Sequence, residues 1–486
     1  MTLKDLSPQT VWHYFGEICQ VPRPSKHEGQ IIEYLINFGK RHGLETKCDE
    51  TGNVLISKKA TQGFENRKTT VLQSHIDMVC EKNSSSTHNF MKDPIVPFVQ
   101  DEWVKAEGTT LGADDGIGMA VQLAILAASD LQHGAIECLF TVDEETGLSG
   151  AFGLKEGFFT GKILINLDSE EEGEIFIGCA GGMDCSGRFD YEYSEVPEGW
   201  FAFRVAVSGL QGGHSGDDIH RGLGNANKLL TRFLHTITRE TGFRLAAIDG
   251  GNLRNAIARE AWAEGVVPFE KKEDVRVLLN ICASEFENEY KGVEAGLRLT
   301  LETVDTPSCV FKESLQSRLL HALYAMPHGV IAMSRDIPGL TETSTNLASV
   351  KMKDDGIWLA TSQRSSVESE KRDIANMVES VFRLAGAECF HSDGYPGWAP
   401  NTDSAILKTA VDTYQKLFGT KPEVKAIHAG LECGLFLEKY PGLDMISVGP
   451  TLRGVHSPDE RLLISSVPKF WEHLLEMLAQ IPENKG

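Results

Sequence analysis

The sequence lacks several features that would assign it to a membrane-bound or nucleic-acid-binding class. No apolar run approaches the roughly 18 residues of a bilayer-spanning helix, and the start, MTLKDLSPQT, lacks the basic-then-apolar pattern of a signal peptide. No run rich in Lys and Arg stands out, and 47 basic against 69 acidic residues give a net charge of −22. We therefore expect a cytosolic protein that binds neither nucleic acid nor membranes.

Cysteine is also sparse. The 486 residues include ten cysteines, which are widely spread and form no CxxC pair. This spacing excludes a dense disulfide framework and a structural zinc site made of thiolates. We interpret the ten as reduced thiols that mostly pack in the interior.

Length and composition indicate several folded domains. A hydrophobic content of 41% with 24% charged residues is typical of globular proteins, and 486 residues exceed one ordinary domain. Two polar, turn-rich passages, GRFDYEYSEVPEGW at 187–200 and SDGYPGWAP at 392–400, interrupt the chain. They predict a first domain split into residues 1–190 and 396–486, with a second domain, 191–395, inserted between its parts.

Periodic apolar positions predict an α/β fold for the split domain. Val11, Phe15 and Ile18 share one helical face, and a capping box at 25–28, SKHE, predicts the start of a second helix. Three short apolar runs predict buried strands: TTVLQSH at 69–75, AIECLFTV at 135–142 and KILINL at 162–167. A helical segment at 116–129 separates the first two, and such alternation is typical of a sheet covered by helices on both faces.

Acidic and imidazole side chains follow these strands. In an α/β sheet, ligands bind at the carboxyl ends of the strands. Five segments supply candidates there: His75 and Asp77 after the first run, Glu144 and Glu145 after the second, Asp168 after the third, His456 beyond DMISVG, and Asp114 with Asp115 in the turn LGADDGIG.

Each piece alone has a simpler interpretation, because a strand-end HxD is often a structural pair and Asp-Asp before a helix is often an N-cap. Jointly, so many like charges at one edge require a cation. Two His and several carboxylates favour zinc, or manganese or cobalt in the same site, and the surplus of ligands suggests two ions sharing a carboxylate. A further carboxylate must stay unligated to move the proton, and spacing leaves open whether Glu144 or Glu145 does so.

Seven motifs also resemble a known family. In chain order they are SHIDMV, GTTLGADDGIGMA, DEETGLSG, INLDSEEEGEI, LQGGHSG, HAGLECGLF and GPTLRGVHSPDE. They are similar to the motifs of the cytosolic non-specific dipeptidases, also called aminoacyl-histidine or Xaa-His dipeptidases, of the M20 group of dinuclear zinc peptidases. The resemblance covers nearly the whole chain and implies a catalytic α/β-sheet domain of the zinc peptidase type, interrupted by a large α+β lid domain.

The resemblance also implies roles for single residues. It assigns one zinc to His75 and Asp168, a second to Glu145 and His456, and the bridging position to Asp114. It makes Glu144 the general base and places Asp77 behind His75 as the residue that orients the imidazole.

Three lid positions match the family as well. His214 corresponds to a histidine that stabilises the oxyanion, although a histidine in a glycine loop can simply belong to a turn. Asn255 and Arg364 are similar to residues that hold the substrate's terminal carboxylate, and both could equally be ordinary fold residues. The role of Glu432 in HAGLECGLF is left open.

The implied activity is hydrolysis of unblocked dipeptides, including Xaa-His dipeptides, by a hydroxide bridging two zinc ions, with Mn²⁺ or Co²⁺ as substitutes. An N-acyl-amino-acid deacylase or a tripeptide aminopeptidase would use the same metal ligands. A catalytically silent scaffold is a third hypothesis, which the intact ligand set disfavours. The sequence leaves open whether the protein forms a homodimer.

Overall fold

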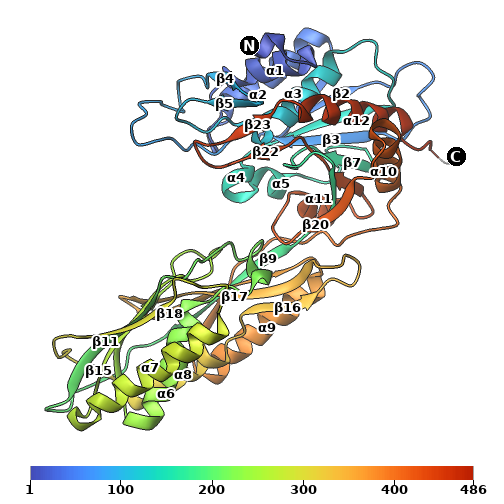
Figure 1. The fold of residues 1–486 in the computed structure, drawn as a ribbon. Coiled ribbons are helices and arrows are strands. Elements are labelled where there is room, and N and C mark those ends of the chain that lie inside the picture. Colours follow the sequence, from blue (N-terminus) through green and yellow to red (C-terminus); the bar gives the residue numbers. More distant parts are fainter. Residues whose placement is uncertain (1, 485–486) are drawn as a thin grey trace. The chain divides into compact units, whose positions relative to one another are not determined.

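The computed structural model describes residues 2–484. The chain folds into two compact units (Figure 1). The first comprises the chain up to Gly178, Trp398–Ala426 and the chain from Leu431. The second comprises Cys179–Gly397 and the short segment Ile427–Gly430. None of the helices described within residues 2–484 combines the length and the hydropathy that spanning a bilayer requires.

An eight-stranded mixed sheet forms the centre of the first unit. The strands Thr70–His75 (β3), Ile136–Thr141 (β6), Ile163–Asn166 (β7) and Asp444–Ser447 (β21) are parallel and adjacent in the order β6-β3-β7-β21. Every residue of β3, β6 and β7 is buried, which is why these strands read as short continuous apolar runs. The flanking strands are Glu45–Cys48 (β1), Val54–Lys58 (β2), Glu174–Cys179 (β8) and Glu423–Ile427 (β20).

Helices cover this sheet. The helix Ala113–Ala127 (α3) packs on β3 and on Gln9–Cys19 (α1), and Ala405–Phe418 (α10) packs on β21 and on Ser466–Gln480 (α12). The other helices are Gly29–His42 (α2), Glu144–Gly147 (α4), Ser149–Gly153 (α5) and Cys433–Lys439 (α11). A small antiparallel sheet joins Leu452–Arg453 (β22), Arg461–Leu463 (β23), Trp103–Ala106 (β5) and Pro97–Gln100 (β4). The predicted α/β class is confirmed.

The predicted capping box at Ser25–Glu28 is wrong. The helix α2 begins at Gly29, and Glu28 accepts a hydrogen bond from the Lys26 backbone N–H at 2.8 Å. The Ser25 hydroxyl donates instead to Asp77 Oδ2 at 2.8 Å. Ser25 therefore supports the residue beyond the end of β3 instead of the start of a helix.

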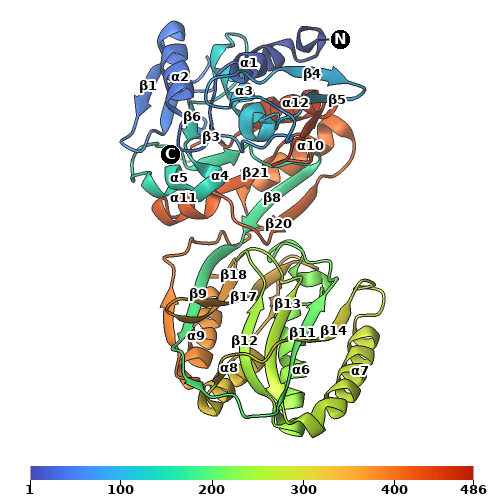
Figure 2. The same ribbon diagram turned by 90° about the vertical axis from the view of Figure 1, so that its left-hand side faces the viewer.

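The second unit is an antiparallel sheet with helices on one face (Figure 2). The helices are Ala226–Thr241 (α6), Lys272–Glu289 (α7), Glu313–Ala325 (α8) and Glu368–Leu384 (α9). The strands, in spatial order, are Arg298–Thr303 (β14), Phe201–Ser208 (β11), Ala261–Val267 (β13), Arg244–Gly250 (β12), Thr341–Lys353 (β17), Gly356–Ser365 (β18), Gly181–Phe189 (β9) and Glu388–His391 (β19), with Gly329–Met333 (β16) also on β17. Tyr193–Ser194 (β10) pairs separately with Val310–Phe311 (β15). Antiparallel strands with segregated helices make this unit α+β.

The extent of β9 explains where the second unit begins. The sequence places the boundary between residues 190 and 191, whereas the structure places it after Gly178. From Gly181 to Phe189, β9 pairs along its whole length with β18, so these residues belong to the sheet of the second unit.

Candidate metal centre

The candidate residues of the first unit lie at one edge of its central sheet. Because β3, β6 and β7 are parallel, their carboxyl ends lie at the same edge. His75 ends β3 with Asp77 two residues beyond, Glu144 opens α4 just after β6, and Asp168 follows β7. Asp114 lies at the start of α3, and His456 lies between β22 and β23.

The side chains of His75, Asp168, Glu145 and His456 meet around Asp114. His75 Nε2 lies 3.0 Å from Asp114 Oδ1 and 3.4 Å from Asp168 Oδ1. His456 Nε2 lies 3.2 Å from Asp114 Oδ2 and 3.1 Å from Glu145 Oε2. The two oxygens of the Asp114 carboxylate thus face two different pairs of side chains.

These separations fit two metal ions that share Asp114. In a tetrahedral zinc site with bonds of about 2.0–2.1 Å, neighbouring ligand atoms are about 3.3 Å apart. The separations of 3.0–3.4 Å match that spacing on both sides of the carboxylate. Glu145 Oε1 is buried and has no hydrogen-bond partner among residues 2–484, which leaves it available to a cation.

The electrostatics of the cluster reflect its excess of carboxylates. Burial opposes protonation of His75, but the charges of Asp168 and Asp114 outweigh it and hold the pKa of the imidazole well above its usual value. Hydrogen bonds to Asp114 and Glu145 raise the pKa of His456 to about 11. An imidazole must be neutral to bind a metal ion, so binding of a cation at these residues would be coupled to release of protons.

Asp77 supports this cluster from behind. Its carboxylate is fully buried and accepts the backbone N–H groups of Glu144 at 3.0 Å and of Glu145 at 3.2 Å. Its Oδ1 also lies 3.3 Å from Nδ1 of His75. One side chain therefore links the imidazole at the end of β3 to the backbone that carries the two glutamates.

Glu144 and Glu145 differ in their surroundings. Glu145 contacts His456, as described above, whereas Glu144 experiences the field of several other carboxylates. Burial, assisted by the charges of Asp168 and Glu432, raises the pKa of Glu144 well above its usual value. A carboxyl group with a raised pKa suits proton transfer near neutral pH.

The sequence left the role of Glu432 open, and the structure places it beneath the strand ends. Its Oε2 accepts hydrogen bonds from Gln73 Nε2 at 2.6 Å and from the Thr141 hydroxyl at 2.8 Å. In the described part of the chain, Oε1 has no partner. Burial raises the pKa of Glu432 to about 8.

The remaining predicted residues, His214, Asn255 and Arg364, lie in the second unit. His214 Nδ1 lies 2.9 Å from Asp217 Oδ2, and the backbone of His214 pairs with Ala256. The Asn255 carbonyl accepts the Ser215 N–H at 2.7 Å. Arg364, in β18, donates through Nη1 to the Tyr395 hydroxyl at 3.0 Å, while its buried Nε has no partner within residues 2–484.

His428, in the second unit, was not among the residues predicted from the sequence. This residue is buried, and its Nε2 lies 2.7 Å from the Ser344 hydroxyl. Burial, assisted by the positive charge of Arg364, lowers the pKa of His428 to about 3. Its Nδ1 lacks a partner in the described residues, as Arg364 Nε does. The available signal was the position of His428 at the start of the motif HAGLECGLF.

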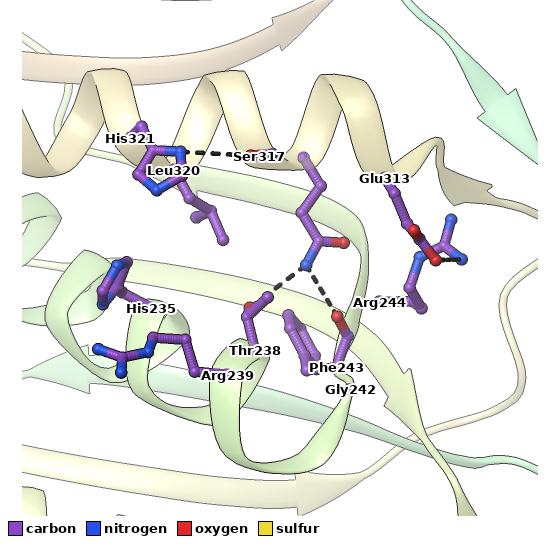
Figure 3. Close-up of a pocket in the computed structure, with 11 residues that line it drawn as sticks. His235, Thr238, Arg239, Gly242, Phe243, Arg244, Glu313, Ser317, Leu320 and His321 are labelled. Carbon is purple, nitrogen blue, oxygen red and sulfur yellow. Dashed lines mark hydrogen bonds and ion pairs between the residues drawn. The ribbon is translucent and has the colours of Figure 1, made fainter.

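A cavity elsewhere in the second unit contains none of these residues. It has a volume of about 400 Å³ between α6 and α8 and is lined by residues such as His235, Arg239, Arg244 and His321 (Figure 3). Gln316, at its wall, donates to the Phe243 carbonyl and to Thr238. The cavity is therefore separate from both groups of candidate residues.

Comparison with known proteins shows that a chain with this fold and this cluster at its strand ends is a peptide hydrolase. Residues 71–480 match the family described as Peptidase family M20/M25/M40. The chain belongs to this family, and the predicted family resemblance is confirmed.

Two relatives match nearly the full length. The chain is 46% identical over 480 residues to the cytosol non-specific dipeptidase of Escherichia coli K12, covering 99% of each chain. Its fold matches the crystal structure of aminoacylhistidine dipeptidase from Vibrio alginolyticus with a TM-score of 0.94 and 44% identity, over 100% of this chain and 99% of the other. A tripeptidase structure from Staphylococcus aureus, at 17% identity and a TM-score of 0.58 over 98% and 99% of the two chains, shares the fold.

Proposed function

We propose that this protein is a metal-dependent dipeptidase that hydrolyses unblocked dipeptides, including Xaa-His dipeptides. The observation that carries the proposal is the Asp114 carboxylate, whose two oxygens face His75 and Asp168 on one side and His456 and Glu145 on the other. The names of the E. coli and V. alginolyticus relatives support the substrate class. The name of the E. coli protein also supports a cytosolic location.

The metal centre would hold two zinc ions, with Mn²⁺ or Co²⁺ as substitutes. His75 and Asp168 would bind one ion, Glu145 and His456 the other, and Asp114 both. Bound there, the ions would polarise the scissile carbonyl and lower the pKa of the attacking water.

The protein's own residues would handle the protons. Glu144 would accept a proton from the attacking water and transfer it to the departing amine, which its raised pKa suits. Asp77 would hold His75 in the orientation in which Nε2 points towards Asp114, and would fix the backbone of Glu144 and Glu145.

Residues of the second unit would bind the rest of the substrate. His214 would stabilise the oxyanion of the tetrahedral intermediate. Arg364 and Asn255 would hold the substrate's carboxylate. Arg364 Nε has no partner among the described residues, which supports this role because a buried guanidinium N–H favours an anionic acceptor.

The test is release of histidine from Gly-His by the purified protein before chelation, after chelation and after zinc is added back. N-acetyl-His and Gly-Gly-His serve as comparison substrates. We expect zinc-dependent cleavage of Gly-His, with the blocked compound left intact and the tripeptide cleaved more slowly. Faster cleavage of N-acetyl-His would instead identify a deacylase, faster cleavage of Gly-Gly-His would identify a tripeptide aminopeptidase, and either result would contradict the proposal.

A further inference from the structure

Two buried charged residues outside the proposed ligand set, Arg23 and Glu460, form hydrogen bonds with the loop that carries Asp114. Arg23 and Glu460 are 3% and 2% exposed, carry opposite charges, and both form hydrogen bonds with the backbone of residues 111–114. Glu460 accepts N–H groups of the loop, and Arg23 donates to one of its carbonyls. Neither residue has a place in the chemistry proposed above.

Glu460 receives four backbone N–H groups in succession. Oε2 accepts those of Leu111 at 2.7 Å and Gly112 at 2.9 Å, and Oε1 accepts those of Ala113 at 2.7 Å and Asp114 at 3.4 Å. Gly112 has a φ of 67°, a left-handed conformation that turns successive N–H groups towards one anion. Because Glu460 follows His456 by four residues, it ties the segment that carries His456 to the loop that carries Asp114.

Arg23 ties the same loop to the end of β3. Its Nη1 donates to the Ile76 carbonyl at 3.1 Å and to the Asp77 carbonyl, and its Nη2 donates to the Gly112 carbonyl. The planar guanidinium donates to both backbone segments through two different nitrogens, whereas lysine has a single ammonium nitrogen for both. The fit leaves no spare space, because a Cβ at Gly112 would lie 2.7 Å from Arg23 Nη2.

We infer that Arg23 and Glu460 are positioning residues that set the spacing between Asp114 and the two imidazoles, and hence the affinity for the metal ions. This inference rests on the metal centre proposed above. His75, Asp114 and His456 lie on three separate backbone segments, with their ligand atoms 3.0 and 3.2 Å apart, and the two side chains join those segments to one another. Both act on backbone atoms of the loop, and hydrogen bonds to charged groups are the stronger kind.

The test compares Glu460→Gln and Arg23→Lys with a matched control, Glu137→Gln. Glu137 is also a buried carboxylate of the first unit that accepts two backbone N–H groups, those of Thr160 and Gly161, both at 2.8 Å. It lies at the amino end of β6, the opposite end from the metal cluster. For each metal-free protein, zinc affinity is measured by competition with a chromophoric chelator, and stability by thermal unfolding.

We expect Glu460→Gln to weaken binding of at least one zinc ion about 10- to 100-fold, as loss of residues that orient metal ligands does. Arg23→Lys should weaken it in the same direction, and Glu137→Gln should lower thermal stability without changing zinc affinity. With one equivalent of zinc per site, kcat of Glu460→Gln on Gly-His should be low and should recover in excess zinc.

Wild-type zinc affinity in Glu460→Gln and Arg23→Lys, with stability lowered as in the control, would overturn the inference. If Glu460→Gln does not fold, the milder Arg23→Lys decides by its zinc affinity. A wild-type protein that binds zinc but does not cleave Gly-His would contradict the proposed substrate while leaving this test intact. A wild-type protein that binds no zinc would overturn the metal centre and this inference together.

Discussion

Replacing Asp77 by asparagine would remove charge and one acceptor atom from behind the proposed metal centre while keeping the side chain's shape. In the structure Oδ1 accepts the Glu144 N–H and lies next to His75, while Oδ2 accepts the Glu145 N–H and the Ser25 hydroxyl. If the asparagine NH₂ group faced His75, the imidazole Nδ1 would have to accept its hydrogen bond, and the ring proton would then sit on Nε2, the atom proposed to bind the metal. We therefore expect the NH₂ group to take the place of Oδ2, where it faces the Glu145 N–H.

The expected magnitude follows from that geometry. The Ser25 hydroxyl can rotate and accept, but the Glu145 N–H loses its partner. A hydrogen bond to a charged group contributes about 1.5–3 kcal/mol, which corresponds to a factor of about 10–100 in an equilibrium constant. We therefore expect Asp77→Asn to lower both zinc affinity and kcat/KM for Gly-His by about 10- to 100-fold.

The assay is a zinc titration of the metal-free protein together with Gly-His hydrolysis in saturating zinc. Ser25→Ala is the control, because it removes the Ser25 contact to Asp77 and keeps the carboxylate, so both quantities should change less than about threefold. Wild-type zinc affinity together with wild-type kcat/KM in Asp77→Asn would show that Asp77 does not support the proposed metal ligands.

Three further predictions concern other parts of the protein. Glu144→Ala should lower kcat by about 10²- to 10⁴-fold while zinc content measured by atomic absorption stays near wild type, and retained turnover would exclude Glu144 as the base. Arg364→Lys should raise KM for Gly-His about tenfold, yet leave cleavage of glycyl-histidinamide unchanged, because the amide lacks the carboxylate; equal effects on both substrates would argue against the assignment. Burial lowers the pKa of His328 to about 4, so the unfolded chain takes up a proton at this residue more readily than the folded protein does. Between pH 7 and pH 5 the free energy of unfolding should therefore fall by about 2 kcal/mol through this group. Urea unfolding of His328→Gln should show a correspondingly weaker pH dependence; an unchanged one would contradict the assigned shift.

Much of the fold could be predicted from the sequence. The runs at 69–75, 135–142 and 162–167 are β3, β6 and β7, because parallel strands buried on both faces have nearly continuous apolar sequences. The domain boundary was harder to predict, because β9 is rich in glycine and polar residues and is a strand through its pairing with β18 and β19. The local sequence at Ser25 was misleading for a similar reason, since its tertiary partner is Asp77.

The chemical groups that follow the strands could be predicted from the sequence, because strand order and side-chain type are local properties. His75, Asp168 and the glutamates after β6 could be expected at one edge once the strands were predicted to be parallel. Their division into two sets around Asp114 depended on His456, whose loop lies far along the chain.

The support of that edge comes from contacts between residues far apart in the chain, which form only in the folded protein. The Leu111 N–H and Glu460 are 349 positions apart, and Arg23 reaches Gly112 across 89. Arg364 Nε and His428 Nδ1, which have no hydrogen-bond partner within residues 2–484, are likewise buried by packing in the second unit. Burial and hydrogen bonding at such separations arise from the packed chain as a whole, and no local pattern of residues encodes them.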